Sequence, residues 1–440
     1  MTARFAIPAF AAFGIELEYA IVRRSTLDVL PYADRLLERL SLRQGALGWC
    51  NELTAHVVEV RNVTPTPALD ELAEGFQREI RAANAILAEW DAQLLPTAMH
   101  PWMNPRRETV LWAHSDRDIY ATYDELFDCR RHGWANIQSM HINLPFANDE
   151  QFRRLHAAVR IVLPLIPALA ASSPVAEGRL TGERDHRLPV YATNASRYPI
   201  ITGAVIPDTV RSAEEYKRNV LQPMYAAIAP DDPGGVLQYE WLNSRGAIPR
   251  FDRDAIEIRV ADTQEHPGAD VAIAQAVIFV TRGLFEERWA PLAAQEKIET
   301  WRLRALLDAT MRDADEAQII DSSFLGLFGI RATPRTASDV WADLLVGAQG
   351  EWVASVEDIL VQGTLARRIE RALRGDATQP RLRAVYEELC DCLDQGRTFN
   401  GPGLVELTAA GAARPAPLPS TRESGEEFLA QGHPMGHTSR

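Results

Sequence analysis

Four short segments with strict two-residue alternation, set between long helical patterns, constrain the fold of this chain most strongly. In residues 13–21 the apolar residues take the odd positions, which places Glu16 and Glu18 together on the opposite face of a strand. The same alternation returns at residues 57–61, 140–144 and 255–261, and residues 236–241 are a fifth candidate. The sequence therefore predicts strands that each carry polar groups on one face.

If these strands share one sheet, their polar residues meet on one concave face. That face would carry Glu16, Glu18, Glu59, His141, Asn143, Glu257 and Arg259. Clustered carboxylates are costly to bury and raise one another's pKa, so a cation between them is the simplest relief. Oxygen ligands without thiolates favour Mg²⁺, with Mn²⁺ as the alternative, and Mg²⁺ commonly bridges carboxylates to phosphates. The pattern predicts a metal–nucleotide site, in which Arg259 could stabilise a transferred phosphoryl group.

Helical patterns fill most of the remaining chain. A long amphipathic helix is expected from about residue 67 to residue 90, with Thr66 as its N-cap and Pro67 at its first position. The chain is almost entirely helical after about residue 268, with helices at 271–289, 297–312, 340–374 and 381–393. We expect a catalytic region over residues 1–290, a helical region of the same fold unit over 291–410, and a disordered tail over 411–440.

Composition narrows the class of protein. A net charge of -14 over 440 residues argues against a nucleic-acid or acidic-membrane partner, which a basic surface would bind. The longest apolar run, residues 155–171, contains an arginine and two prolines and is too short for a membrane span, so it predicts a buried helix. The four cysteines show no metal-ligand spacing or disulfide pattern, which favours the cytoplasm.

Four of these segments also resemble one known family. GIELEY (14–19) resembles the opening signature of the second type of glutamate–cysteine ligases and related carboxylate–amine ligases. Further matches follow in the family's order: HVVEVRNVTPTP (56–67), SMHINLPF (139–146) and AIEIRVADTQE (255–265). The resemblance covers roughly residues 10–290, a span judged from the spacing of these motifs.

The resemblance implies an α+β fold like that of glutamine synthetase, with a curved antiparallel sheet, helices packed outside it and a helical C-terminal region. It implies an ATP-dependent, ADP-forming ligase that phosphorylates the side-chain carboxylate of glutamate and then joins it to an amine such as cysteine. Matched residues would bind Mg²⁺: Glu16, Glu18, Glu59 and Glu257. Arg259 would contact the γ-phosphoryl group, and His141 would lie beside the phosphates or the substrate carboxylate.

The amine site is less defined. Asn143 stands where many members of the family have a second histidine, so its part in choosing the acceptor is open. Arg131, Arg197 and Arg245 lie in stretches rich in polar and aromatic residues, and we expect one or two of them to bind an amino-acid carboxylate. Both substrates would be small molecules, and the sequence gives no oligomeric state.

Three interpretations of the polar face stay open. The first is the ligase, with cysteine or another amine as acceptor. The second is a metal-dependent phosphatase or nucleotide hydrolase, because the same carboxylates and Mg²⁺ would serve attack by water. The third is a non-catalytic binding protein on a ligase fold. Individual residues also have alternatives: Arg259 could simply pair with Glu257, His141 could be structural, and Asp262 could either orient Arg259 or cap the next segment.

Overall fold

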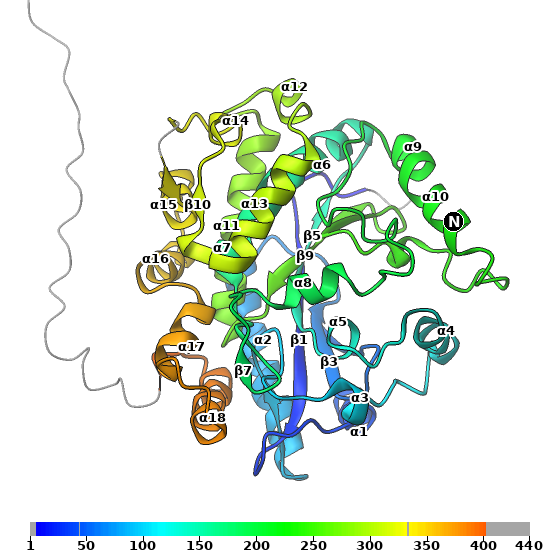
Figure 1. Cartoon of the computed structure of the whole chain (residues 1–440), viewed down its shortest axis with the longest axis vertical. Helices are drawn as coiled ribbons and strands as arrows, with labels where there is room; N and C mark the ends of the chain where they lie inside the picture. Colours follow the sequence, from blue (N-terminus) through cyan, green and yellow to red (C-terminus); the bar gives the residue numbers. More distant parts are fainter. Residues whose placement is uncertain (1–5, 44, 332–333, 402–440) are drawn as a thin grey trace, which may run out of the picture. The chain divides into compact units, whose positions relative to one another are not determined.

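The computed structural model describes residues 6–43, 45–331 and 334–401. Its centre is a seven-stranded antiparallel sheet in the order β2-β3-β1-β5-β9-β8, with β4 paired to β1 (Figure 1). The strands are β1 (Gly14–Arg23), β2 (Leu47–Asn51), β3 (Val57–Asn62), β4 (Ala92–Leu95), β5 (Ser139–Pro145), β8 (Ala247–Arg250) and β9 (Ala255–Asp262). The four strands predicted from alternation, β1, β3, β5 and β9, are confirmed and neighbour one another in this sheet.

Strand register brings the predicted polar residues to one face. In the antiparallel pairs, Glu18 lies opposite Glu59, and Glu16 lies opposite His141. Asn143 lies opposite Glu257, while a register shift between Met140 and Ile142 interrupts the pairing of β5 with β9. Residues directly opposite in an antiparallel pair point to the same side of the sheet. The alternation thus produces a continuous polar surface across four strands.

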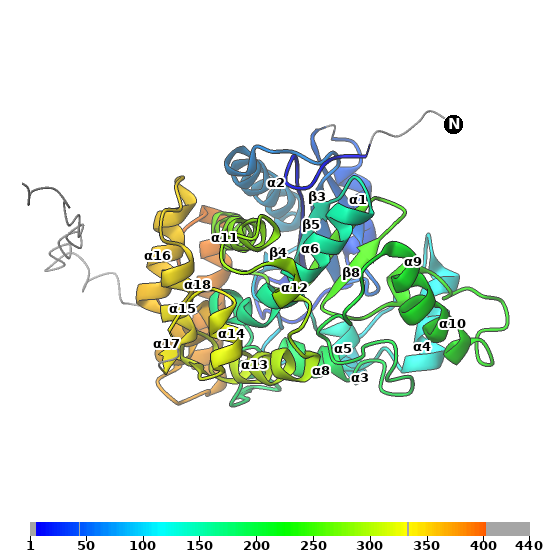
Figure 2. The ribbon, with the colours of Figure 1, turned by 90° about the horizontal axis from the view of Figure 1, so that it is seen from above.

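The other face of the sheet lies in the main hydrophobic core. Ile15, Leu17, Tyr19 and Ile21 of β1 are fully buried there. The core also contains residues of α2 (Leu69–Ala88), α6 (Asp149–Val162) and α11 (Pro267–Phe285), and Figure 2 shows these three helices next to one another. Among the described residues, α11 is the helix whose length and composition match a membrane span, but 72% of that window is buried inside the protein, as expected for a core helix.

Shorter elements build the surroundings of the sheet. The helices before β9 are α1 (Ala33–Leu40), α3 (Pro105–Glu108), α4 (Arg117–Phe127), α5 (His132–Ala135), α7 (Pro167–Ala170), α8 (Arg187–Ala192), α9 (Ala213–Tyr216) and α10 (Gln222–Ile228). Those after α11 are α12 (Leu292–Gln295), α13 (Thr300–Asp313), α14 (Ser322–Gly326), α15 (Ala337–Leu344), α16 (Trp352–Gln362), α17 (Leu365–Leu373) and α18 (Gln379–Gln395). Among the described residues, two small two-stranded sheets pair β6 (Val175–Ala176) with β7 (Arg179–Leu180) and β10 (Gln318–Ile319) with β11 (Arg335–Thr336).

Two local predictions are wrong. Thr66 is not the N-cap of α2, because its backbone pairs with Phe13 and its hydroxyl accepts from the Ala68 amide, so the helix begins only at Leu69. Residues 236–241 do not form a strand. The Asp232 carboxylate accepts the amides of Val236 and Leu237, which fixes a turn there, and a 3₁₀ turn over Glu240–Leu242 follows.

Two long predicted helices are divided. The region 340–374 contains α15, α16 and α17, and the breaks carry Gly347, Gly350 and Gly363 with positive φ angles of 83°, 127° and 90°. The predicted helix 155–171 is buried as expected, but prolines divide it into α6, a 3₁₀ turn (Leu163–Leu165) and α7. Residues 411–440, predicted as a disordered tail, lie outside the described part of the chain, and the boundary at residue 290 stays a prediction.

Candidate active site

A cavity of about 510 Å³ opens over the polar face of the sheet. Its floor contains five predicted residues, all at most 9% exposed: Glu16, Glu18, Glu59, His141 and Glu257. Arg259 also lines the cavity, whereas Asn143 borders it through a hydrogen bond from its Nδ2 to Glu16 Oε1 at 3.1 Å. The structure therefore brings together the residues that alternation placed on one face.

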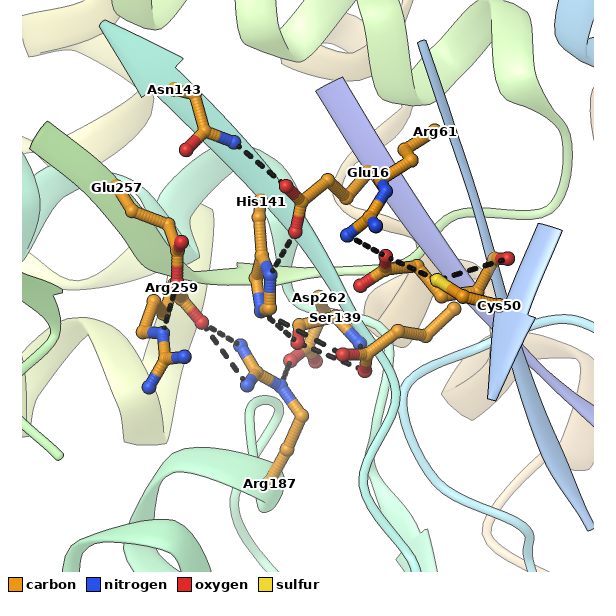
Figure 3. Close-up of polar contacts among 12 residues, drawn as sticks. Glu16, Cys50, Arg61, Ser139, His141, Asn143, Arg187, Glu257, Arg259 and Asp262 are labelled. Carbon is orange, nitrogen blue, oxygen red and sulfur yellow. Dashed lines mark hydrogen bonds and ion pairs between the residues drawn. The ribbon is translucent and has the colours of Figure 1, made fainter. Parts of the chain in front are cut away.

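His141 links two of the carboxylates (Figure 3). Its Nδ1 lies 3.0 Å from Glu16 Oε2, and its Nε2 lies 3.0 Å from Ser139 Oγ and 3.7 Å from Glu18 Oε1. Burial alone would lower the pKa of His141, but the hydrogen bond to Glu16 and the surrounding carboxylates raise it to about 9. At neutral pH the imidazole is therefore cationic and partly compensates the carboxylates.

Glu59 is less well compensated. Burial and the charge of Glu16 raise its pKa to about 8. Its Oε1 accepts from the Cys50 thiol at 2.9 Å and from Arg61 Nη1 at 3.2 Å. Glu52, which follows β2, has its pKa raised well above the ordinary value by burial and by Glu18, Glu59 and Glu16. The raised pKa values of Glu59 and Glu52 thus show that ionising these neighbouring buried carboxyls is costly, a cost that a bound cation would relieve.

In the described part of the chain, two groups of side chains have ligand atoms within 4.8 Å of one another, close enough to hold a metal ion: Glu16, Glu59 and His141, and Glu18, Glu52 and Glu59. The donors are carboxylate oxygens with one imidazole, and such oxygens suit Mg²⁺ or Mn²⁺. Glu52 was not predicted, because it lies in the irregular segment between β2 and β3, where alternation gives no signal. The carboxylate set therefore fits divalent cations and is larger than expected.

Glu257 and Arg259 form a tight pair on β9. Arg259 Nε donates to Glu257 Oε1 at 2.6 Å, and Arg250 Nη1 donates to Glu257 Oε2 at 3.0 Å. Burial would raise the pKa of Glu257, but Arg259, His141 and Arg250 lower it to about 2. Glu257 is therefore ionised, and it holds the Arg259 guanidinium at the cavity wall. The alternative that Arg259 pairs with Glu257 is observed, and this pairing is compatible with a role toward a substrate.

Asp262 neither pairs with the Arg259 side chain nor caps the next segment. It accepts from Arg187 Nε at 2.5 Å and from Ser173 Oγ at 2.7 Å. Arg187 also donates through both terminal nitrogens to the Arg259 carbonyl at 3.2 Å (Figure 3). Asp262 and Arg187 thus fix the backbone that carries Arg259, an indirect form of positioning.

An aromatic wall faces the carboxylate floor. It consists of Tyr120 and Tyr123 of α4, Trp134 of α5, Tyr191 of α8 and Trp241 of the 3₁₀ turn after residue 239. Tyr123 connects its members, with ring centroids 5.1 Å from Trp134 and 5.7 Å from Trp241. These residues come from segments far apart in the sequence, so the sequence pattern could not group them.

The three arginines predicted to bind a carboxylate are not among the residues that line this cavity. Arg131 donates to the carbonyls of Phe127 and Asn194, and Arg197 pairs with Asp231 at 2.9 Å. Arg245 is buried and donates to Asp208 at 2.7 Å. The arginines that line the cavity are Arg61, Arg187, Arg250, Arg253 and Arg259. The local density of polar and aromatic residues in the sequence therefore did not distinguish arginines that line the cavity from arginines that lie elsewhere.

Known proteins share this architecture at low sequence identity. A structure of glutamate–cysteine ligase from Francisella tularensis in complex with AMP has a TM-score of 0.53 and 15% identity, covering 89% of this chain and 90% of that one. A bifunctional glutathione synthetase from Pasteurella multocida has a TM-score of 0.54 and 13% identity, covering 88% of this chain and 51% of that one. The antiparallel sheet and the outer helices thus define an α+β fold of the glutamine-synthetase-like type.

The chain belongs to glutamate–cysteine ligase family 2, whose model matches residues 12–388. An uncharacterized protein of Archaeoglobus fulgidus is 33% identical over 69% of this chain and 86% of its own length. A protein of Bradyrhizobium sp. strain BTAi1, named "Putative glutamate--cysteine ligase 2", is 27% identical over 62% of this chain and 62% of its own length. The chain thus matches less than two thirds of that Bradyrhizobium relative.

The family assignment extends the resemblance found in the sequence. The predicted span ended near residue 290, whereas the family model continues to residue 388 and so includes most of the C-terminal helices. These helices carry few motifs of their own. Their membership in the family could not be recognised from alternation.

Proposed function

We propose that this protein is an ATP- and Mg²⁺-dependent carboxylate–amine ligase that forms an amide through an acyl phosphate and releases ADP and phosphate. One observation supports this proposal above the others: buried carboxylates of β1, β3 and β9, with His141 of β5, meet at the floor of one cavity that has Arg259 at its wall. Such a floor suits metal ions that carry a nucleotide's phosphates, and the arginine suits the charge that develops during phosphoryl transfer.

Five carboxylates would hold the metal ions: Glu16, Glu18, Glu52, Glu59 and Glu257. Bound Mg²⁺ would screen the negative charge between a substrate carboxylate and a triphosphate. His141, cationic through its contact with Glu16, would remain beside the phosphates or the substrate carboxylate. Arg259, held by Glu257 and by the Arg187–backbone contacts, would face the γ-phosphoryl group in the transition state.

The reaction would have two steps. A carboxylate oxygen of the donor attacks the γ-phosphorus of ATP, and the bond to the ADP oxygen breaks. The amine nitrogen then attacks the acyl carbon of this acyl phosphate, loses a proton, and displaces phosphate, which carries away one oxygen of the original carboxylate. Holding both substrates in one cavity makes each step effectively intramolecular.

The finer details rest on the relatives. Family membership favours the side-chain carboxylate of glutamate as donor and cysteine as one acceptor, which would place the product in glutathione biosynthesis. The Francisella tularensis ligase is in complex with AMP, which supports a nucleotide as cosubstrate for this chain. The aromatic wall leaves another amino acid or amine as an alternative acceptor. Both substrates would be small molecules, and the cytoplasmic location stays a prediction.

ADP release by the purified protein tests the proposal and separates it from a hydrolase. The protein receives ATP, Mg²⁺ and glutamate, with no amine, with cysteine, or with a pool of amino acids and amines. A ligase releases ADP only when both glutamate and a suitable amine are present, whereas a hydrolase needs neither.

Glu16→Gln is the control variant, because it keeps the shape of a floor residue but removes its charge. Release that needs both substrates and disappears in this variant would support the ligase and identify the class of acceptor. Release without glutamate or amine would contradict it. Failure to bind any nucleotide would instead support the non-catalytic interpretation.

A further inference from the structure

Arginines occupy the places beside the floor where metal ions are expected. Arg61 Nη1 lies 3.2 Å from Glu59 Oε1, Arg250 Nη1 lies 3.0 Å from Glu257 Oε2, and Arg253 Nη1 lies 3.9 Å from Glu16 Oε1. We call Arg61, Arg250 and Arg253 the basic end of the cavity, because they gather where Glu16 and Glu257 lie. Each of these guanidiniums contacts one of the proposed metal ligands. Arg250 and Arg253 also pair with Asp252, at 3.4 Å and 3.7 Å.

Exposure separates two members of the basic end from the third. The side chains of Arg61 and Arg253 are 40% and 41% exposed, whereas that of Arg250 is 11% exposed. The carboxylates that they contact, Glu59 and Glu16, are 5% and 9% exposed. Buried carboxylates need a cation nearby. A half-exposed guanidinium, by contrast, can break its ion pair and bind another anion with little loss of free energy.

A divalent cation on Glu59 and Glu16 would replace these arginines. A metal ion and a guanidinium repel each other, and both need the same carboxylate oxygens, so the two contacts compete. Arg61 lies directly opposite Glu16 in the pairing of β1 with β3, so its released guanidinium stays over the same cavity. A phosphate group bound in the cavity could then accept from Arg61, because the forked guanidinium matches phosphate oxygens.

We propose that Arg61 and Arg253 exchange partners during substrate binding: they pair with Glu59 and Glu16 before metal binds, and then bind the polyphosphate of the nucleotide. This inference rests on the proposed function, since it needs a metal and a nucleotide in the cavity. It adds two phosphate-binding residues. It also gives a physical reason for cooperative binding: the metal releases the arginines that bind the nucleotide, and the nucleotide keeps these arginines away from the carboxylates that bind the metal.

Direct binding measurements on Arg61→Gln test the exchange without turnover. Mn²⁺ affinity is measured in the absence of nucleotide by counting free Mn²⁺ with electron paramagnetic resonance, and ADP affinity is measured by calorimetry at saturating Mn²⁺. Loss of the competing ion pair should tighten Mn²⁺ binding about twofold to fivefold. Loss of the phosphate contact should weaken ADP binding about tenfold or more.

Arg253→Gln should change both affinities in the same directions, and Arg61→Lys should retain part of the ADP affinity, since it keeps the charge but loses the fork. Arg78→Gln is the matched control, because Arg78 is 68% exposed and pairs with Glu74 on α2. It removes the same charge outside the cavity and should leave both affinities unchanged. Equal changes in this control would show a general field effect and overturn the exchange.

Other results would also overturn the inference. Wild-type binding of Mn²⁺ and ADP, with both affinities unchanged in Arg61→Gln, would contradict the exchange while leaving the proposed ligase intact. Weaker glutamate binding with normal ADP binding would assign Arg61 to the donor carboxylate instead. A wild-type protein that binds neither Mn²⁺ nor ADP would contradict both the inference and the proposed function.

Discussion

Arg259 makes its contacts through a planar fork that no other side chain reproduces. Its Nε donates to Glu257, which leaves its terminal nitrogens for a phosphoryl group. Arg259→Lys keeps the positive charge but loses this geometry, so we expect kcat to fall about 10- to 100-fold with little change in KM for ATP. Steady-state ADP release measures both constants. A higher KM with unchanged kcat would place Arg259 in ground-state binding instead.

His156 is a buried histidine, and its protonation should make the stability of the fold depend on pH. It is 2% exposed, its ring packs against Phe152 and Tyr216, and neither ring nitrogen has a partner among the described residues. Burial, with Arg160 and Arg245 nearby, lowers its pKa to about 3. Between the unfolded value of about 6.5 and this value, only the unfolded chain takes up the proton, so acid destabilises the fold.

We therefore expect His156 to cost about 2 kcal/mol of unfolding free energy when pH falls from 7.5 to 5. His156→Phe removes the titration and keeps an aromatic ring, so it should lose about 2 kcal/mol less over this range. Urea unfolding at the two pH values measures the difference. An equal loss in the wild type and the variant would show that His156 titrates normally in the folded protein.

Single residues of the floor were predictable when they lay on regular strands. Glu16, Glu18, Glu59, His141 and Glu257 follow from alternation, because a strand fixes the side on which each residue lies. Other residues were not predictable. Glu52 lies outside the regular strands, and the position of Arg245 depends on its contact with Asp208, which is 37 residues away along the chain. For such residues the sequence shows which side chain is present, but the tertiary fold determines which residue that side chain contacts.

At the level of secondary-structure elements, α2 holds the end of α18 through polar side chains. Asn84 Nδ2 donates to Asp394 Oδ1 at 3.0 Å, and Asn84 Oδ1 accepts the Leu94 amide at 2.9 Å, so one buried side chain joins α2, β4 and α18. Gln77 and Arg81 donate to the carbonyls of the last turn of α18. These contacts satisfy groups that a helix end leaves without partners.

Asn84→Ala should reduce the unfolding free energy by about 1–3 kcal/mol, because it leaves the buried Leu94 amide without an acceptor. Arg81→Ala removes more exposed contacts of the same interface and should cost only about 0.5 kcal/mol. Chemical denaturation of both variants provides the comparison. The assignment of Asn84 as the main link fails if the two variants are equally stable.

The boundaries of elements were less predictable than their existence. The helix α2 and the strand β9 lie close to their predicted positions, since long periodic patterns dominate there. The segment 236–241 alternates like a strand, but the Asp232 carboxylate takes two of its amides and thus fixes a turn. These local hydrogen bonds determined the backbone conformation, although the two-residue alternation of the side chains favours a strand.

On the scale of the whole molecule, the carboxylate floor is an electrostatic cost that a bound metal should relieve. Any ligand that binds only the folded state stabilises it, by about 2.7 kcal/mol at a hundredfold excess over its Kd. Mg²⁺ or Mn²⁺ should therefore raise the Tm, and Glu18→Gln should reduce this response because it removes a ligand. Thermal unfolding at constant ionic strength measures both effects. An equal increase with Na⁺ would show charge screening rather than a metal site.

The arrangement of the cavity as a whole could be predicted only in part. Its floor comes from four regular strands, whereas its aromatic wall comes from α4, α5, α8 and the 3₁₀ turn at residues 240–242. No periodicity relates these segments, since only the packed fold brings them together. The placement of the floor residues was thus accessible from the sequence, and that of the aromatic wall was not.

The central claim is that the donor carboxylate itself becomes phosphorylated, and oxygen transfer tests this most directly. The protein is supplied with ATP, Mg²⁺, an amine acceptor and glutamate labelled with ¹⁸O in its carboxylates, and the released phosphate is analysed by mass spectrometry. Our account predicts one ¹⁸O atom in each phosphate, because phosphate leaves with an oxygen of the original carboxylate. Unlabelled phosphate from glutamate-dependent turnover would contradict the acyl-phosphate mechanism and favour attack on ATP by water.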